Sequence, residues 1–263
     1  RQRQMCIRDR QNGVCRKITP PLRRERLFFY MNNLSISILG DIFKGNYIYA
    51  IITIVARMFV VFCCLPVHEL AHGWAAYKQG DDTAKKLGRL SFNPFSHLDP
   101  IGTIMIFLFG IGYAKPVPIN PLKFKNYRKG VALTALAGPL SNLVMSFIFA
   151  FIGSGLNRLA GANTAMQLLV LFFGFAANIN IALAVFNLLP IPPLDGSRVL
   201  AVILPDRAYE KYFRYERYIM IALMVLLFTG VLDTPLALLN NLFHKFIYLS
   251  LIHISEPTRR VVI

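Results

Sequence analysis

His68-Glu69-Leu70-Ala71-His72 places two imidazoles and a carboxylate within one short stretch. On an α-helix, positions i and i+4 lie on one face about one turn apart, so both imidazoles can bind a single Zn²⁺ at roughly 2.0–2.1 Å. Zinc lowers the pKa of a bound water to about 7, and Glu69, beside the first ligand, can accept its proton. The spacing therefore predicts zinc-assisted hydrolysis, and two packing histidines with a glutamate at the helix surface are the alternative.

A catalytic zinc needs a third protein ligand and an open coordination position. The candidates elsewhere in the chain are two histidines and three carboxylates: His97, His244, Asp99, Asp195 and Asp233. Asp195 ends a run that several prolines break, so the chain can turn there inside the membrane. The spacing leaves two interpretations of Asp195 open, because its carboxylate could bind the metal or could cap the helix that follows.

Gly138-Pro139-Leu140-Ser141-Asn142 interrupts another apolar segment with a pair that can open or kink a helix, followed by an amide. A buried Asn142 could make an ordinary hydrogen bond between helices. It could also donate to the carbonyl of a substrate as that carbonyl becomes an oxyanion. The residue types alone do not decide between these two roles.

The elements that must position these residues are membrane helices. Hydrophobic residues make up 55% of the chain and charged residues 16%, against about 25% charged residues in soluble proteins. Four segments, at about 47–67, 131–153, 166–189 and 215–232, are long and apolar enough to span a bilayer. The first runs into the histidine motif, so we expect one helix over roughly 47–79. The sequence predicts an all-α polytopic membrane protein with a bundle of about 4–6 transmembrane helices.

Between the first two of these segments the pattern changes. Residues 80–100 are polar and rich in turn formers, and residues 101–114 are apolar but short, with three glycines. Residues 115–130 combine three prolines with five Lys/Arg. We expect a re-entrant or extended segment near 85–125, and cytoplasmic exposure of the basic loop, which puts the site toward the cytoplasmic side.

Both ends of the chain carry a pattern that belongs to DNA rather than to protein. Met5–Arg10 and Leu249–Ile254 can be encoded by opposite strands of one inverted repeat, as in a sequencing adapter read through in frame. We therefore expect adapter-derived and upstream sequence in residues 1–30 and an adapter-derived tail in residues 249–263. Residues 31–248 are expected to form a single membrane domain.

The net charge of the chain depends on those ends. Residues 1–30 carry nine Lys/Arg and two Asp/Glu, and residues 249–263 carry two Arg and one Glu, so the formal charge of +16 falls to +8 without them. The remaining basic residues lie in short loops between apolar runs, where cytoplasmic Lys/Arg excess is the usual cause. This distribution indicates a membrane partner and not a nucleic acid.

Together, HELAH, GPLSN and the later N-x-x-P-x-P-x-L-D-G run resemble the site-2 protease family, peptidase family M50 of intramembrane zinc metalloproteases. The resemblance covers most of residues 47–205 and is closest to the compact bacterial type. It implies His68, His72 and Asp195 as the ligands of one zinc ion. It also implies that Glu69 is the catalytic base.

The same resemblance suggests Asn142 and Asn187 as candidates for positioning substrate or stabilising the oxyanion. Residues 31–248 leave no room for the PDZ or CBS domain that many family members carry. The implied substrates are single-span proteins of the bacterial plasma membrane, which could pair as an added strand with backbone near 85–125. The alternatives are a non-proteolytic polytopic protein with a structural zinc site and a metal transporter. Nothing in the sequence predicts an oligomeric state.

Overall fold

The computed structural model describes residues 6–8, 15–17, 37–102, 104, 115–161 and 163–255. The chain divides into two compact units, Arg1–Asn33 and Leu34–Ile263. In the first unit, strands β1 (Cys6–Arg8) and β2 (Cys15–Lys17) form an antiparallel pair. The expected origin of the two ends in adapter sequence stays a prediction.

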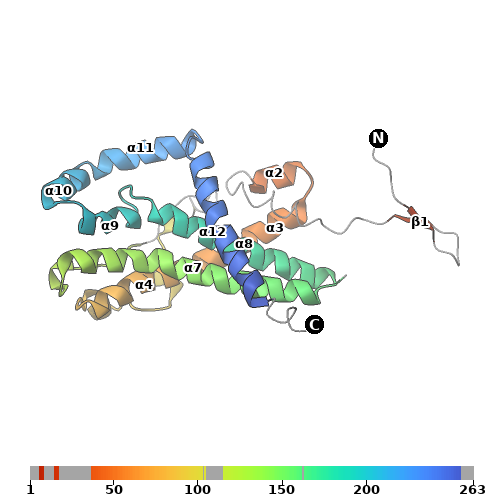
Figure 1. Cartoon of the computed structure of the whole chain (residues 1–263), viewed down its shortest axis with the longest axis horizontal. Coiled ribbons are helices and arrows are strands. Elements are labelled where there is room, and N and C mark those ends of the chain that lie inside the picture. The colour runs from red at the N-terminus through yellow and green to blue at the C-terminus, as the bar shows by residue number, and fades with distance from the viewer. Residues whose placement is uncertain are drawn as a thin grey trace, which may run out of the picture. The chain divides into compact units, whose positions relative to one another are not determined.

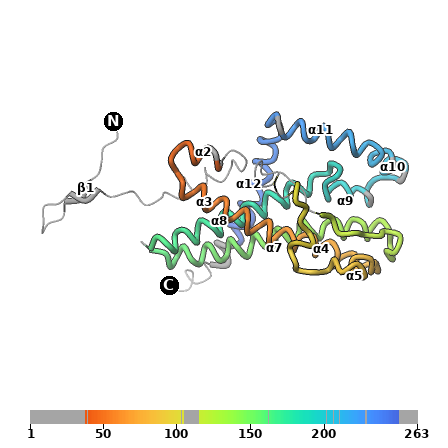
Figure 2. The backbone as a smooth tube through the Cα atoms, turned by 180° about the vertical axis from the view of Figure 1, so that it is seen from behind, coloured from red at the N-terminus to blue at the C-terminus, as the bar shows by residue number. Residues whose placement is uncertain are grey.

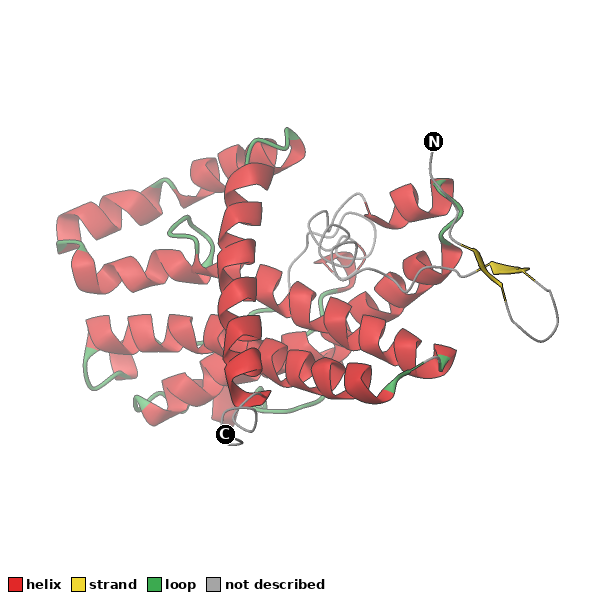
Figure 3. Ribbon diagram, turned by 45° about the vertical axis from the view of Figure 1, so that its right-hand side comes forward, coloured by secondary structure: helices red, strands yellow, loops and turns green. Residues whose placement is uncertain are grey.

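The second unit contains helices and no strand among its described residues (Figures 1 and 3). In chain order its elements are α2 (Ser37–Phe43), α3 (Tyr47–Phe59), the π-helical turn η1 (Val60–Cys64), α4 (Leu65–Lys78), α5 (Thr83–Lys86), the 3₁₀ turns η2 (Pro94–Ser96) and η3 (Pro121–Lys123), α7 (Tyr127–Leu159), α8 (Thr164–Leu188), α9 (Asp195–Ile203), α10 (Asp206–Arg214), α11 (Glu216–Phe228) and α12 (Asp233–Ser255). The predicted all-α fold is confirmed in this unit.

Three helices in the described part of the chain are long and apolar enough to cross a membrane: Tyr47–Lys78, Tyr127–Leu159 and Thr164–Leu188. The first confirms the expected single helix over roughly 47–79, which consists of α3, η1 and α4. The fourth predicted span, 215–232, is not among them. Its helix α11 has 13 residues, so it is only about 20 Å long at 1.5 Å per residue, against about 30 Å of hydrocarbon.

The turn η1 ends four residues before His68 and is explained by the proline that follows it. Pro66 stands in the first turn of α4, where it donates no backbone hydrogen bond and its ring crowds the carbonyl four residues earlier. The backbone widens there, and Leu65 N–H donates to Val60 O, five residues back. The helix therefore continues past Pro66 and delivers His68 and His72 to the interior. Such π turns are rare in proteins, and those that occur often lie at functional sites.

Helices α7 and α8 lie side by side along much of their length, and α4 packs against α7 (Figures 1 and 2). Pro139 lies inside α7 without ending it, so the helix does not open at the Gly138-Pro139 pair. Many of the buried residues of α7 and α8 are small, as in other membrane bundles. One buried cluster joins α3, η1 and α8: Ala56, Val60, Cys64, Ala176 and Ile179.

The C-terminal helix α12 crosses α7 and α8 (Figures 1 and 3). Its Ile247 is buried against Ala150 of α7 and Ala177 of α8. The sequence predicts an amphipathic interfacial helix over 235–248. The helix is longer, reaching Ser255, and part of it packs against the bundle.

The described residues between α4 and α7 include one short helix, two 3₁₀ turns and connecting loops, and a buried carboxylate joins two of these loops. Asp81 is fully buried, and its side chain accepts hydrogen bonds from Thr83 N (3.0 Å) and Asn120 N (2.6 Å). Lys115 N–H also donates to His97 O at 2.7 Å. The described residues 115–120 have no regular structure. Residues 105–114, part of the expected re-entrant segment, lie outside the described residues.

Candidate metal centre

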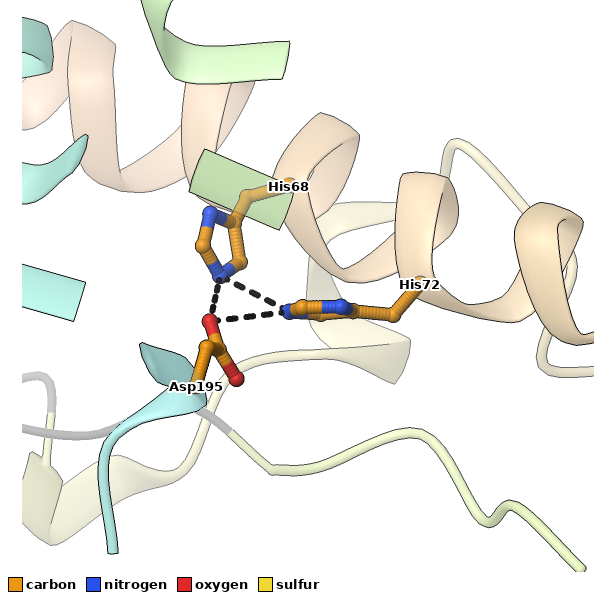
Figure 4. A group of neighbouring side chains, drawn as sticks. All are labelled: His68, His72 and Asp195. Carbon is orange, nitrogen blue, oxygen red and sulfur yellow. Dashed lines mark hydrogen bonds and ion pairs between the residues drawn. The ribbon is translucent and has the colours of Figure 1, made fainter. Parts of the chain in front are cut away.

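Three potential metal ligands converge from two elements that are distant in sequence. His68 and His72 lie one turn apart on α4, and Asp195 is the first residue of α9 (Figure 4). Asp195 Oδ2 lies 3.3 Å from His68 Nε2 and 3.2 Å from His72 Nε2. The two Nε2 atoms are 3.0 Å apart. The structure thus brings together the three residues that the sequence indicated.

The dimensions of this triangle fit a zinc ion. Ligand atoms at 2.0–2.1 Å from a tetrahedral zinc are about 3.3–3.4 Å apart, and the observed edges are 3.0–3.3 Å. Asp195 Oδ2 is buried and makes no hydrogen bond to any described residue. A buried carboxylate oxygen that faces two imidazole nitrogens without a hydrogen bond is the donor set expected for a cation.

The carboxylate of Asp195 belongs to this group and does not cap α9. The N-cap position is occupied by Leu194, and Asp195 is the first residue inside the helix. Of the two interpretations that the spacing leaves open, the geometry favours the ligand over the cap.

Gly196 sets the position of Asp195. A Cβ on Gly196 would lie within 2.5 Å of Leu189 O and closer still to Leu188 O. Because these are backbone atoms at the end of α8, they cannot move aside as a flexible side chain could. The start of α9 therefore rests directly on the end of α8, which fixes the carboxylate opposite the histidines.

Helix α7 supplies the contacts on the far side of the two imidazole rings. His72 Nδ1 lies 2.8 Å from Thr134 O, and His68 Nδ1 lies 3.1 Å from the side-chain amide of Asn142. A Cβ on Gly138 would overlap His72 Nε2 and come within 2.7 Å of His68 Cε1. Sequence patterns do not predict the role of Thr134, because a backbone carbonyl leaves no signature in residue types. The pattern around Gly138 predicts only an opening or a kink.

Glu69 faces the irregular segment before α7. Val117 N–H donates to Glu69 Oε2 at 3.2 Å. Val117 stands between two prolines, which have no N–H and favour extended backbone. Arg89 contacts the same extended segment, since its side chain donates a hydrogen bond to Lys115 O at 2.9 Å. No residue type signals the Val117 contact, because it again involves a backbone atom.

The other candidate ligands lie outside the group formed by His68, His72 and Asp195. His97 is fully buried, and its Nε2 is 2.8 Å from Ser91 O. Asp99 accepts a hydrogen bond from Gly102 N at 2.9 Å. His244 stacks on Tyr248 with ring centroids 4.2 Å apart.

The remaining candidates are Asp233 and Asn187. Asp233 lies in the first turn of α12 and is not part of the group. Asn187 donates to Leu183 O at 3.0 Å, one turn back on α8, so its amide is engaged within its own helix. The suggested role of Asn187 in binding substrate stays a prediction.

Comparisons with known proteins found matches to this chain. The sequence profile described as Peptidase family M50 matches residues 154–230. The protein named "Putative zinc metalloprotease YwhC" of Bacillus subtilis is 44% identical over 168 residues, which cover 62% of this chain and 75% of that protein.

More distant relatives carry similar names. "Putative zinc metalloprotease MJ0611" of Methanocaldococcus jannaschii is 30% identical over 169 residues, covering 64% of this chain and 81% of that protein. "Putative zinc metalloprotease Rip2" of Mycolicibacterium smegmatis is 27% identical over 195 residues, covering 72% of this chain and 71% of that protein. No solved structure gave a significant match. The identity to YwhC over three quarters of its length shows that this chain, a membrane protein, belongs to peptidase family M50, the site-2 protease family of zinc metalloproteases.

Proposed function

We propose that this protein hydrolyses peptide bonds in or near the transmembrane segments of single-span membrane proteins. The observation that carries the proposal is the convergence of His68, His72 and Asp195, with ligand atoms 3.0–3.3 Å apart, beside Glu69 on a helix of membrane-spanning length. Within the described residues the group has three members. Three ligands and an open position are typical of catalytic zinc, whereas structural sites usually have four protein ligands.

His68, His72 and Asp195 would hold one zinc ion per chain. When bound, the ion would polarise the scissile carbonyl and acidify a water molecule. The two imidazoles are buried, which shields the site from bulk water and strengthens its electrostatic interactions. The proposal of a single ion follows from the size of the triangle, which accommodates one cation.

Glu69 is the proposed proton carrier. It directly follows the first ligand, His68, and is only partly exposed. Its carboxylate would take a proton from the attacking water and pass it to the leaving amine. Val117 N–H, at 3.2 Å from Oε2, orients the carboxylate through that oxygen, and the proton would go to Oε1.

The depth of the site supports cleavage at the membrane. Thr134, which contacts His72, lies seven residues after Tyr127, where α7 begins, a distance of about 10 Å along the helix. The basic residues of 123–129 precede that point, and such residues favour the cytoplasmic face. The proposed location is therefore the plasma membrane, with the site near its cytoplasmic side. A substrate helix would have to unwind there, because helical carbonyls are engaged in i→i−4 hydrogen bonds.

The direct test compares the purified wild type with Glu69→Gln in detergent micelles against a panel of single-span substrates. Glu69→Gln keeps the size of the side chain and removes the base. We expect the variant to retain zinc and to lose cleavage by at least about 100-fold. Full cleavage by a zinc-loaded Glu69→Gln protein would contradict the proposed mechanism.

A further inference from the structure

One face of α7 matches the two histidines of α4 position by position. Thr134, Gly138 and Asn142 are spaced four residues apart, so they lie on one face of α7. Thr134 O contacts His72 Nδ1, and the Asn142 amide contacts His68 Nδ1. The later residue of α7 meets the earlier residue of α4, so the helices run antiparallel here. Gly138, between the two contacts, has no side chain to keep them apart.

A histidine that binds a metal through Nε2 must keep the lone pair on that atom, so its proton sits on Nδ1. For His72 the neighbour ensures this arrangement. Thr134 O can only accept a hydrogen bond, so His72 Nδ1–H donates to it and Nε2 keeps its lone pair. The same requirement applies to His68, whose Nε2 faces Asp195 Oδ2 at 3.3 Å.

The neighbour of His68 is an amide, which has an acceptor end and a donor end of the same shape. In the structure the Nδ2 end lies 3.1 Å from His68 Nδ1. That orientation would put the ring proton on Nε2, where the metal must bind. Asn142 Oδ1 is buried without a hydrogen bond to any described residue, so turning the amide by 180° breaks no hydrogen bond made by that oxygen.

We infer that Asn142 is the positioning residue of His68 in the metal-bound protein. Its Oδ1 accepts the hydrogen bond from His68 Nδ1–H, which fixes the ring and leaves Nε2 available to the ion. Asn142 is fully buried and contacts the ring at Nδ1 rather than at Nε2, so it does not face a substrate carbonyl. This inference rests on the proposed function, because it assumes that His68, His72 and Asp195 bind a metal.

The test measures zinc affinity rather than cleavage. Full-length wild type, Asn142→Asp, Asn142→Leu and Asn142→Ala are purified in detergent and titrated with Zn²⁺ against a chromophoric chelator. Asp keeps an acceptor of the same size, whereas Leu and Ala have none. The matched control is Asn180→Leu, because Asn180 is equally buried but contacts Ala176 O and Cys64 Sγ.

We expect Asn142→Asp and Asn180→Leu to bind zinc no more weakly than the wild type. Asn142→Leu should bind about 10–100-fold more weakly, as is usual when the hydrogen-bond partner of a ligand histidine is removed. The absorption bands of Co²⁺ bound in place of zinc should change in the same variant. If Asn142→Leu does not fold, Asn142→Ala should show the same loss.

Each other result overturns the inference. A weakened Asn142→Asp would mean that the amide donates to His68. Unchanged zinc affinity in Asn142→Leu, with reduced cleavage, would assign Asn142 to the substrate instead. A wild type that binds no zinc would contradict the proposed function itself. A wild type that binds zinc together with an unaffected Asn142→Leu variant would contradict only the role of Asn142.

Discussion

Gly138 of α7 lies directly against the ring of His72 on α4, and a Cβ at this position would overlap His72 Nε2. The glycine therefore lets α7 approach closely enough for its neighbours to contact both histidines. A side chain here would occupy the space in which the metal-binding nitrogens meet. If His68 and His72 bind the proposed zinc ion, the spacing between α4 and α7 determines whether their ligand atoms can meet.

Gly138→Ala should weaken zinc binding by at least about tenfold, in the range seen when ligand positions are disturbed. The added methyl group must displace His72, although alanine favours the helix by about 1 kcal/mol. Zinc competition titration measures the effect. Gly155→Ala is the matched control, since Gly155 lies on the same helix and an added methyl group there would meet nothing within 4 Å. Equal zinc affinity in the two variants would show that the close approach is unimportant.

Gly196→Ala should destabilise the protein as well as the site. The new Cβ would collide with Leu188 O and Leu189 O, which are backbone atoms, and overpacking of this kind costs about 1–3 kcal/mol. The thermal unfolding temperature in detergent and the zinc content should both fall. Gly174→Ala on α8, where nothing lies within 4 Å, should leave both unchanged. A Gly196→Ala protein as stable as Gly174→Ala would refute the contact.

Part of the site could be predicted because its chemistry depends on side chains, and two of them have the regular i, i+4 spacing of one helix face. The i, i+4 spacing indicates His68 and His72 with Glu69 between them. For Asp195 the spacing leaves a ligand and a helix cap equally open, and the family resemblance implies the ligand. Thr134 O and Val117 N could not be found this way, since any residue type other than proline supplies both backbone atoms. Their positions depend on how helices and loops pack, which local sequence does not encode.

The number of membrane spans also could not be predicted fully from the sequence. The apolar stretch 215–232 satisfies a composition criterion, but its helix α11 ends at Phe228 after 13 residues. Gly230 follows with a φ of +72°, a left-handed conformation that ends helices. The turn at Gly230 thus shortens the helix, whereas hydrophobicity alone predicts a longer one.

The stability of the segment that contacts Glu69 should depend on pH, because Asp81 anchors this segment through Asn120. Burial raises the pKa of Asp81, but hydrogen bonds from Thr83 and Asn120 and the charge of Lys123 lower it below its ordinary value. A depressed carboxyl pKa stabilises the folded state fully above the unfolded pKa of about 3.9, and this stabilisation is lost as the pH falls through the folded value. The thermal unfolding temperature of the wild type should therefore fall below about pH 4.

Asp81→Asn should remove that part of the pH dependence and cost about 1–3 kcal/mol at neutral pH, because the amide NH₂ group would have to face the N–H of either Thr83 or Asn120. Cleavage should fall as well, since the same segment carries Val117. Asp82→Asn is the control: Asp82 makes surface ion pairs with Lys86 and Lys123 and should matter less. Identical unfolding curves for Asp81→Asn and the wild type at pH 7 would argue against this anchoring.

The zinc content of the wild type and of Asp195→Ala tests the central claim most directly. Asp195 is distant in sequence from the histidines and meets them only in the folded protein. Elemental analysis of the purified, chelator-washed proteins should find about one zinc per wild-type chain and less than about 0.1 per Asp195→Ala chain, with cleavage lost in step. Full zinc occupancy in a folded Asp195→Ala protein would contradict the assignment of this triad as the metal centre.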